Sequence, residues 1–249
     1  MIKLRKINNE VVKPIPVKKI NPNNIRGYDL FPELYANIFL LAKKKSGKTS
    51  AIYKILKKCA DKNSKVVIFA STVHKDPNWL AIIKWLKKKE IPFVSYTSFT
   101  DEGLNQLDEL TKFLENEEEE GIKDEDGNRI TAEEILGLIP EEEYERKPRL
   151  IIPEYIIVMD DLSIELRNPN VSHLLKRNRH FRSKVIMSSQ YLHDLKPESI
   201  QQLDYILIWP GITESKLIKI YENLNLAIPY SLFKTLYENA NSRSTISCM

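Results

Sequence analysis

The chain has 249 residues, a formal net charge of +4, 42% hydrophobic residues and two cysteines. This composition supplies the apolar core of an α/β domain and excludes a strongly basic coat protein, so any contact with DNA must come from local basic patches. It also excludes a disulfide framework, since Cys59 and Cys248 stand alone, and no apolar run reaches the ~20 residues that span a bilayer, so we expect a soluble intracellular protein.

The first 33 residues are expected to form an N-terminal arm. They are polar and carry prolines at 14, 16, 22 and 32. Because proline is confined to sheet edges, the segment 11–17 predicts a short edge strand. The remaining residues, 34–249, are expected to form a single domain.

Short apolar runs alternate with amphipathic segments along this domain. The apolar runs predict buried strands over 36–42, 65–71, 92–98, 155–161, 184–190 and 204–209. The amphipathic segments predict helices over 48–60, 79–89, 213–224 and 230–239. Strands that alternate with helices indicate an α/β fold with a mostly parallel sheet and helices on both faces.

An acidic stretch at about 113–147 interrupts this alternation. It contains the blocks ENEEEE and EEEYE and the turn sequence DEDGN. We expect a solvated insertion in the domain. Thr131 and Glu134 have the spacing of a capping box, which predicts one short helix inside it.

The sequence AKKKSGKT at 42–49 fits a P-loop with alanine at its first position. A P-loop ends a strand, wraps backbone N–H groups around phosphates and starts a helix whose N-terminus favours anions. Lys48 is expected to reach the β- and γ-phosphates of ATP, and Thr49 to hold Mg²⁺. The predicted nucleotide-binding residues are Ala42, Lys43, Lys44, Lys45, Ser46, Gly47, Lys48, Thr49 and Ser50. The alternative is a lysine-rich surface turn.

Two adjacent carboxylates end the apolar run IIVMDD at 156–161. Asp160 is expected to hold Mg²⁺, directly or through water, and Asp161 to orient or deprotonate the attacking water. The pair favours a hydrolase over a small-molecule kinase, which needs no water-activating carboxylate. In the alternative interpretation the two aspartates only cap a turn.

A basic segment precedes the apolar run that ends in Ser188, Ser189 and Gln190. A glutamine at a strand tip can hydrogen-bond the γ-phosphate or the attacking water. Arg179 is the candidate arginine finger, acting within its own subunit or across an interface. Alternatively, Gln190 is an ordinary polar strand end, and the arginines belong to a solvated helix face.

Four segments resemble a known family when they are taken in order. They are LLAKKKSGKTS (40–50), VVIFASTVHKDPNW (66–79), IIVMDDLS (156–163) and LKRNRHFRSKVIMSSQYLHDLKPESI (175–200). The chain is similar to the genome-packaging ATPases of nucleocytoplasmic large DNA viruses and virophages, the poxvirus-type branch of the FtsK–HerA superfamily. The acidic insertion is not part of that motif set, and NSRSTISCM at the end lacks the apolar strand expected after the last helix.

The resemblance implies a RecA-like P-loop NTPase in which the strand of Gln190 lies between the P-loop strand and the strand of Asp160. It implies ATP and Mg²⁺ as cofactors, a hexameric homo-oligomeric ring with ATP between subunits, and double-stranded DNA in the channel. It also implies capsid proteins as partners, and a location in the virion and in the viral factory of the host-cell cytoplasm. The implied function is packaging of the viral genome.

Three other interpretations stay open at this point. The chain could be a helicase-like or DNA-mobilising ATPase of the same superfamily, a P-loop kinase of a small molecule, or a nucleotide-binding scaffold without turnover. The lysines at 84 and 87–89 could line a DNA channel or simply face water at a helix end, and we favour the second interpretation.

Overall fold

The computed structural model describes residues 22–101, 103–120, 122–123, 129–130 and 150–244. The strand expected over 11–17 and the capping box at Thr131 lie outside these residues. Within them, no helix is both long and apolar enough to cross a membrane.

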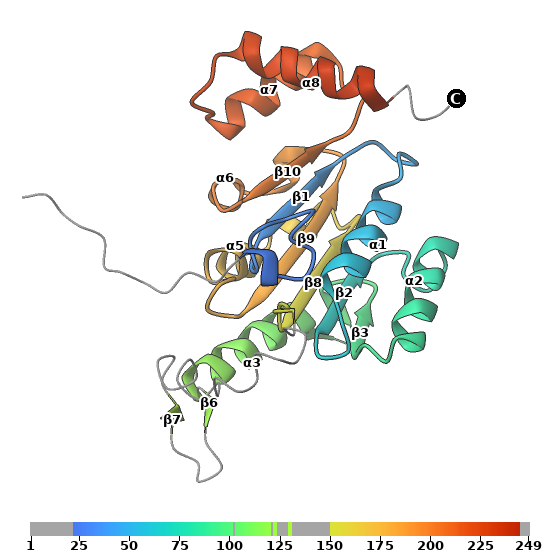
Figure 1. Ribbon diagram of the computed structural model, residues 1–249, viewed down its shortest axis with the longest axis vertical. Helices are drawn as coiled ribbons and strands as arrows, with labels where there is room; N and C mark the ends of the chain where they lie inside the picture. The colour runs from blue at the N-terminus through green and yellow to red at the C-terminus, as the bar shows by residue number, and fades with distance from the viewer. Residues whose placement is uncertain (1–21, 102, 121, 124–128, 131–149, 245–249) are drawn as a thin grey trace, which may run out of the picture.

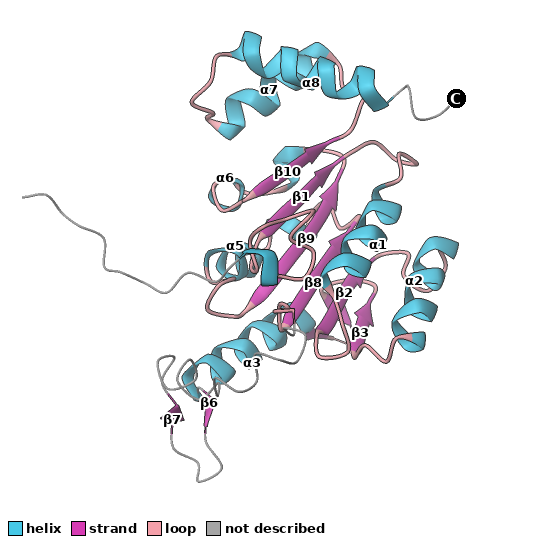
Figure 2. Ribbon diagram, viewed as in Figure 1, coloured by secondary structure: helices cyan, strands magenta, loops and turns pink. Residues whose placement is uncertain are grey.

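A six-stranded sheet with the order β10-β1-β9-β8-β2-β3 forms the centre of the protein (Figure 1). Every neighbouring pair in it is parallel, as the arrows in Figure 2 show. Its strands are β1 (Asn37–Leu41), β2 (Lys65–Ala70), β3 (Phe93–Tyr96), β8 (Tyr155–Asp160), β9 (Ser183–Ser189) and β10 (Tyr205–Ile208). All of the carboxyl ends therefore meet at one edge of the sheet.

Helices α1 (Lys48–Cys59) and α2 (Pro77–Lys88) cover one face of the sheet. Each has an apolar stripe at helical spacing, such as Ile52 and Leu56 on α1, which packs against the inward side chains of β1 and β8. Asp76 caps α2 by accepting a hydrogen bond from the backbone N–H of Asn78. This face holds the N-terminus of α1 at the carboxyl edge of β1.

Helices α3 (Gln106–Glu120) and α5 (Pro169–Lys176) cover the other face. Leu107, Leu114 and Leu174 are buried there against the second set of strand side chains. The helices α6 (Pro197–Ile200), α7 (Glu214–Leu224) and α8 (Tyr230–Ser244) follow, with α7 and α8 beyond the β10 edge of the sheet (Figure 1). Helices on both faces are thus confirmed.

Short elements complete the described chain. The 3₁₀ helices are η1 (Pro22–Asn24), η3 (Glu165–Arg167) and η4 (Leu192–Asp194). Two small antiparallel pairs join β4 (Thr100–Asp101) to β5 (Leu104–Asn105) and β6 (Ile122–Lys123) to β7 (Arg129–Ile130).

The expected limits of the acidic insertion and of the N-terminal arm differ from the structure. Helix α3 extends to Glu120 and buries Leu114, so the first residues of the predicted insertion at 113–147 belong to a packed helix. The reason is that an apolar stripe of the helix faces the sheet, while Glu115 and Glu117 form hydrogen bonds to His173 and Tyr155 of the same domain. The end of the predicted arm also packs on the domain, because Ile25 and Phe31 are buried.

The strand order agrees with the order that the family resemblance implies. β9, which ends at Ser189, pairs on one side with β1 and on the other with β8. Gln190 therefore follows a strand that lies between the P-loop strand and the strand of Asp160. The chain has the α/β fold of a P-loop NTPase.

Candidate functional site

The segment between β1 and α1 has the backbone shape of a phosphate loop. Lys45 and Gly47 both have positive φ, 62° and 92°, and the hydroxyl of Ser46 donates to the carbonyl of Lys43 at 2.6 Å. Alternation between left-handed and right-handed residues turns successive backbone N–H groups toward one concavity, which binds anions. At Gly47 a side chain would meet no neighbouring atom, so the positive φ is the reason for glycine here.

Lys48 begins α1 and is buried with 8% exposure. Its Nζ donates to the carbonyl of Ala42 at 3.3 Å, so the side chain folds back across the loop. Lys43, Lys44 and Lys45 are exposed. The loop thus combines one inward cation with the N-terminus of a helix, and both favour a phosphate group.

Asp160 is the acidic centre of the site. It is 5% exposed and ends β8. Its Oδ2 accepts from the hydroxyl of Thr49 at 3.3 Å and from the indole Nε1 of Trp79 at 3.0 Å, and its Oδ1 accepts from the hydroxyl of Ser188. Burial raises the pKa of this carboxyl, while the hydrogen bonds from Ser188 and Trp79 and the charge of Lys48 oppose that rise.

The contact between Thr49 and Asp160 joins segments that are far apart in the sequence. Sequence analysis predicted both residues as magnesium ligands, and the structure brings them together. It missed Trp79 and Ser188, which hold the carboxylate in place. Two sequence signals could have indicated them: the capping residue Asp76, which starts the helix that carries Trp79, and the consecutive serines at the end of β9.

Oxygen atoms of one carboxylate and one hydroxyl are ligands that Mg²⁺ accepts. Among the described residues, no group of three His, Cys, Asp or Glu side chains could hold a metal by itself. A site with few protein ligands fits Mg²⁺, which keeps several waters and usually binds through one or two carboxylates plus phosphate oxygens. The residues present therefore fit a magnesium–nucleotide complex.

Asp161 and Gln190 lie at the same carboxyl edge. Asp161 follows β8 with a φ of 57° and is exposed, and its carbonyl accepts from the hydroxyl of Ser71 at 3.5 Å. Gln190 follows β9 and is partly exposed. The side chains of both residues are accessible to solvent at the edge of the sheet that carries the phosphate loop.

Arg179 lies at the opposite edge of the sheet. It belongs to the turn between α5 and β9, which leads into the amino end of a strand. Its neighbours in the turn are paired, with Arg177 on Glu115 at 3.2 Å and Arg182 on Glu154 at 3.1 Å. Arg179 itself is exposed. Within one chain the structure does not bring it together with Lys48.

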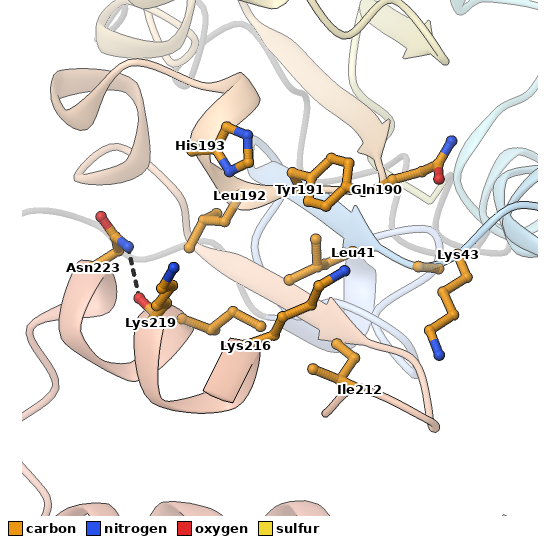
Figure 3. Close-up of a pocket in the computed structure, with 12 residues that line it drawn as sticks. Leu41, Lys43, Gln190, Tyr191, Leu192, His193, Ile212, Lys216, Lys219 and Asn223 are labelled. Atoms are coloured by element: carbon orange, nitrogen blue, oxygen red, sulfur yellow. Dashed lines mark hydrogen bonds between the residues drawn. The ribbon is translucent and has the colours of Figure 1, made fainter. Parts of the chain in front are cut away.

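A cavity of about 430 Å³ opens beside the phosphate loop (Figure 3). It lies on the face of the sheet opposite α1, because its apolar lining belongs to the core cluster of that face. Its apolar wall includes Leu41, Leu192 and Ile220, which belong to the core on that face. Gln190 and Lys43 lie at one end, away from Asn223 on α7. The cavity thus adjoins the end of β1, but α1 is on the other side of the sheet.

No known family model matches the sequence, and no curated protein sequence matches it. Similar solved structures include the genome packaging NTPase B204 from Sulfolobus turreted icosahedral virus 2 in complex with ATP-gammaS, with a TM-score of 0.45, 16% identity, and coverage of 77% of this chain and 82% of that chain. The same NTPase in complex with AMP gives 0.47, 16%, 77% and 83%. B204, the DNA-packaging ATPase from Sulfolobus Turreted Icosahedral Virus, gives 0.45, 16%, 76% and 82%. Matches at this level do not assign a function.

Proposed function

We propose that this protein is a magnesium-dependent ATPase that moves double-stranded DNA and packages a viral genome into its capsid. The observation that carries the proposal is the 3.3 Å contact between Thr49 Oγ1 and Asp160 Oδ2 at the N-terminus of α1. It places a carboxylate and a hydroxyl directly beside a loop that is shaped for phosphates.

The binding step follows from the loop and the two ligands. Backbone N–H groups of residues 43–49 hold the phosphates of ATP, and Lys48 exchanges its bond to the Ala42 carbonyl for a phosphate oxygen. Thr49 and Asp160 would hold Mg²⁺. When bound, the ion neutralises charge on the phosphate oxygens. Trp79 and Ser188 keep the Asp160 carboxylate turned toward Thr49.

The hydrolytic step needs a residue that orients water. Asp161 is exposed beside the buried Asp160, and a carboxylate there accepts a proton from water. Gln190, at the tip of the neighbouring strand, donates or accepts a hydrogen bond to that water or to the terminal phosphate. These two residues favour hydrolysis over the kinase and scaffold interpretations.

A ring of identical subunits is supported by the position of Arg179. β9 has seven residues, so at about 3.3 Å per residue the two ends of the strand are roughly 20 Å apart. Arg179 precedes this strand, and the nucleotide site lies beyond its far end. An arginine at this position can stabilise the charge of a transferring phosphate only on a neighbouring subunit.

The DNA-moving part of the proposal is supported by the sequence resemblance to packaging ATPases and by the place of β9 between β1 and β8. Contacts would be to DNA phosphates and nearly independent of sequence, because a motor must pass any sequence.

The test is steady-state ATP hydrolysis with and without long duplex DNA, with Lys48→Ala as the inactive control. Stimulation by duplex DNA is expected for a translocase, and a rate indifferent to DNA would overturn it. Strand separation in a parallel assay would instead indicate the helicase-like alternative.

A further inference from the structure

Trp209 lies at a corner of the carboxyl edge that the proposed mechanism does not use. It directly follows β10, and its backbone N–H donates to the carbonyl of Leu41, the last residue of β1, at 3.0 Å. The turn that it starts adjoins the phosphate loop, because a Cβ on Gly211 would lie 3.8 Å from Lys43 Nζ. Trp209 is therefore next to the site at which β1 becomes the P-loop.

The side chain of Trp209 is on the face that carries α1. It packs against the core cluster that contains Leu40 and Ile52 of that face, and it is only partly buried. Phe31 and Tyr205 are in ring contact at 4.8 Å, so the amino half of β10 is covered on this side. Leu207 and Trp209, nearer the carboxyl end, remain partly exposed.

The direction of a bound nucleotide follows from the proposed site. Its terminal phosphates would lie toward Thr49 and Asp160, because these are the residues that would hold Mg²⁺. Asp160 belongs to β8, which lies on one side of β1, and β10 lies on the other. The nucleoside must leave the loop on the side away from β8, and it must stay on the face where α1 presents its N-terminus. Both conditions lead to Trp209.

We propose that Trp209 is the platform on which the base of the nucleotide stacks; this inference rests on the proposed ATP site. A large, flat and partly exposed ring suits the face of a purine. Tyr237 of α8 fixes the turn that carries it: the Tyr237 hydroxyl donates to the carbonyl of Trp209 at 3.1 Å and accepts from the N–H of Ile212 at 3.0 Å. Tyr237 is thus a positioning residue.

The cavity in Figure 3 is the competing location for the base. It contains an exposed aromatic side chain, Tyr191, at the end of β9. However, its wall belongs to the core cluster on the face opposite α1. A base in that cavity would have to pass around the end of β1 while its phosphates remained at the N-terminus of α1.

The test compares calorimetric binding of Mg-ATP and of inorganic tripolyphosphate with Mg²⁺. The two share the phosphate contacts, and only ATP has a base. For Trp209→Ala we expect the Kd of ATP to rise about tenfold to a hundredfold, while the Kd of tripolyphosphate stays within about twofold. Tyr191→Ala, an aromatic deletion at the same edge on the other face, is the matched control and is expected to show no selective loss.

If the alanine variant does not fold, ATP binding and the thermal unfolding midpoint are measured instead on Trp209→Phe and Trp209→Leu. Phenylalanine should keep most of the ATP affinity, and leucine should lose it. Equal changes for both ligands, or a selective loss in Tyr191→Ala, would overturn the inference. Wild-type protein that binds neither ligand would instead overturn the proposed ATP site.

Discussion

Trp79→Phe is the substitution that tests most sharply how the acidic centre is held. Trp79 is fully buried on α2, and its indole Nε1 donates to Asp160 Oδ2 at 3.0 Å. Phenylalanine keeps an aromatic ring in the core and removes only the donor and part of the volume. Asp160 then retains Ser188 and Thr49 as donors, but one of its oxygens is less restrained.

The expected cost in stability has two parts. A hydrogen bond to a charged group contributes about 1.5–3 kcal/mol. The smaller ring adds about 1 kcal/mol of lost packing, as in other buried substitutions that delete few atoms. The free energy of unfolding should therefore fall by about 2.5–4 kcal/mol. The loss of a group that orients a metal ligand should also raise the Mg²⁺ concentration for half-maximal ATPase activity about 10- to 100-fold.

Trp85→Phe is the matched control. Trp85 is on the same helix, is partly exposed and makes an edge contact with Tyr53 at 5.6 Å, so the same exchange should cost less than about 1 kcal/mol. Denaturant unfolding and Mg²⁺ titration of the ATPase are measured on both variants. A Trp79→Phe protein that is destabilised but has the Mg²⁺ dependence of Trp85→Phe would refute a positioning role for Trp79.

Four further predictions use other parts of the structure. Lys48→Ala should abolish ATP hydrolysis because it removes the only cation turned into the loop among the described residues, and normal turnover in a phosphate-release assay would count against the site. Asp161→Asn should keep ATP binding and lose hydrolysis. Lost binding with unimpaired chemistry would reverse the roles assigned to Asp160 and Asp161. Arg179→Ala should lower the ATPase rate without unfolding the chain, and mixing it with Lys48→Ala should restore activity, because the intact groups meet across one interface; no rescue at any ratio would contradict action between subunits. Burial lowers the pKa of Lys184 below its ordinary 10.5, so the native state disfavours the charged amine. As pH rises from neutral toward 10.5, wild-type protein should gain unfolding free energy relative to Lys184→Met, and parallel curves in urea would disprove this.

The strands could be predicted from the sequence because each is a short apolar run between polar turns. β1, β8 and β9 are buried along their whole length, and their polar residues, such as Asn37, Lys184 and Ser189, stand near the ends of the strands, so each central run is apolar. Helix α3 was missed for the opposite reason. Its surface is so acidic that the segment resembled an insertion, although Leu107 and Leu114 form its buried side.

The phosphate loop and Asp160 could be found because their chemistry is local to a motif. The partners of Asp160 could not, since Trp79 and Ser188 come from different elements and meet only in the fold. The sequence alone could have placed Arg179 away from the phosphate loop of its own chain. A residue before a parallel strand lies at the amino edge of the sheet, whereas a P-loop follows its strand and lies at the carboxyl edge. That argument excludes action on its own P-loop.

The central claim is that the loop at 42–49 and the carboxylate of Asp160 hold one magnesium–triphosphate. It is tested most directly by a crystal structure with Mn²⁺ and a non-hydrolysable ATP analogue, in which anomalous scattering locates the metal. We predict one strong peak between Thr49 Oγ1 and the Asp160 carboxylate, beside phosphates cradled by the loop. A metal and nucleotide bound anywhere else in the protein would contradict the account.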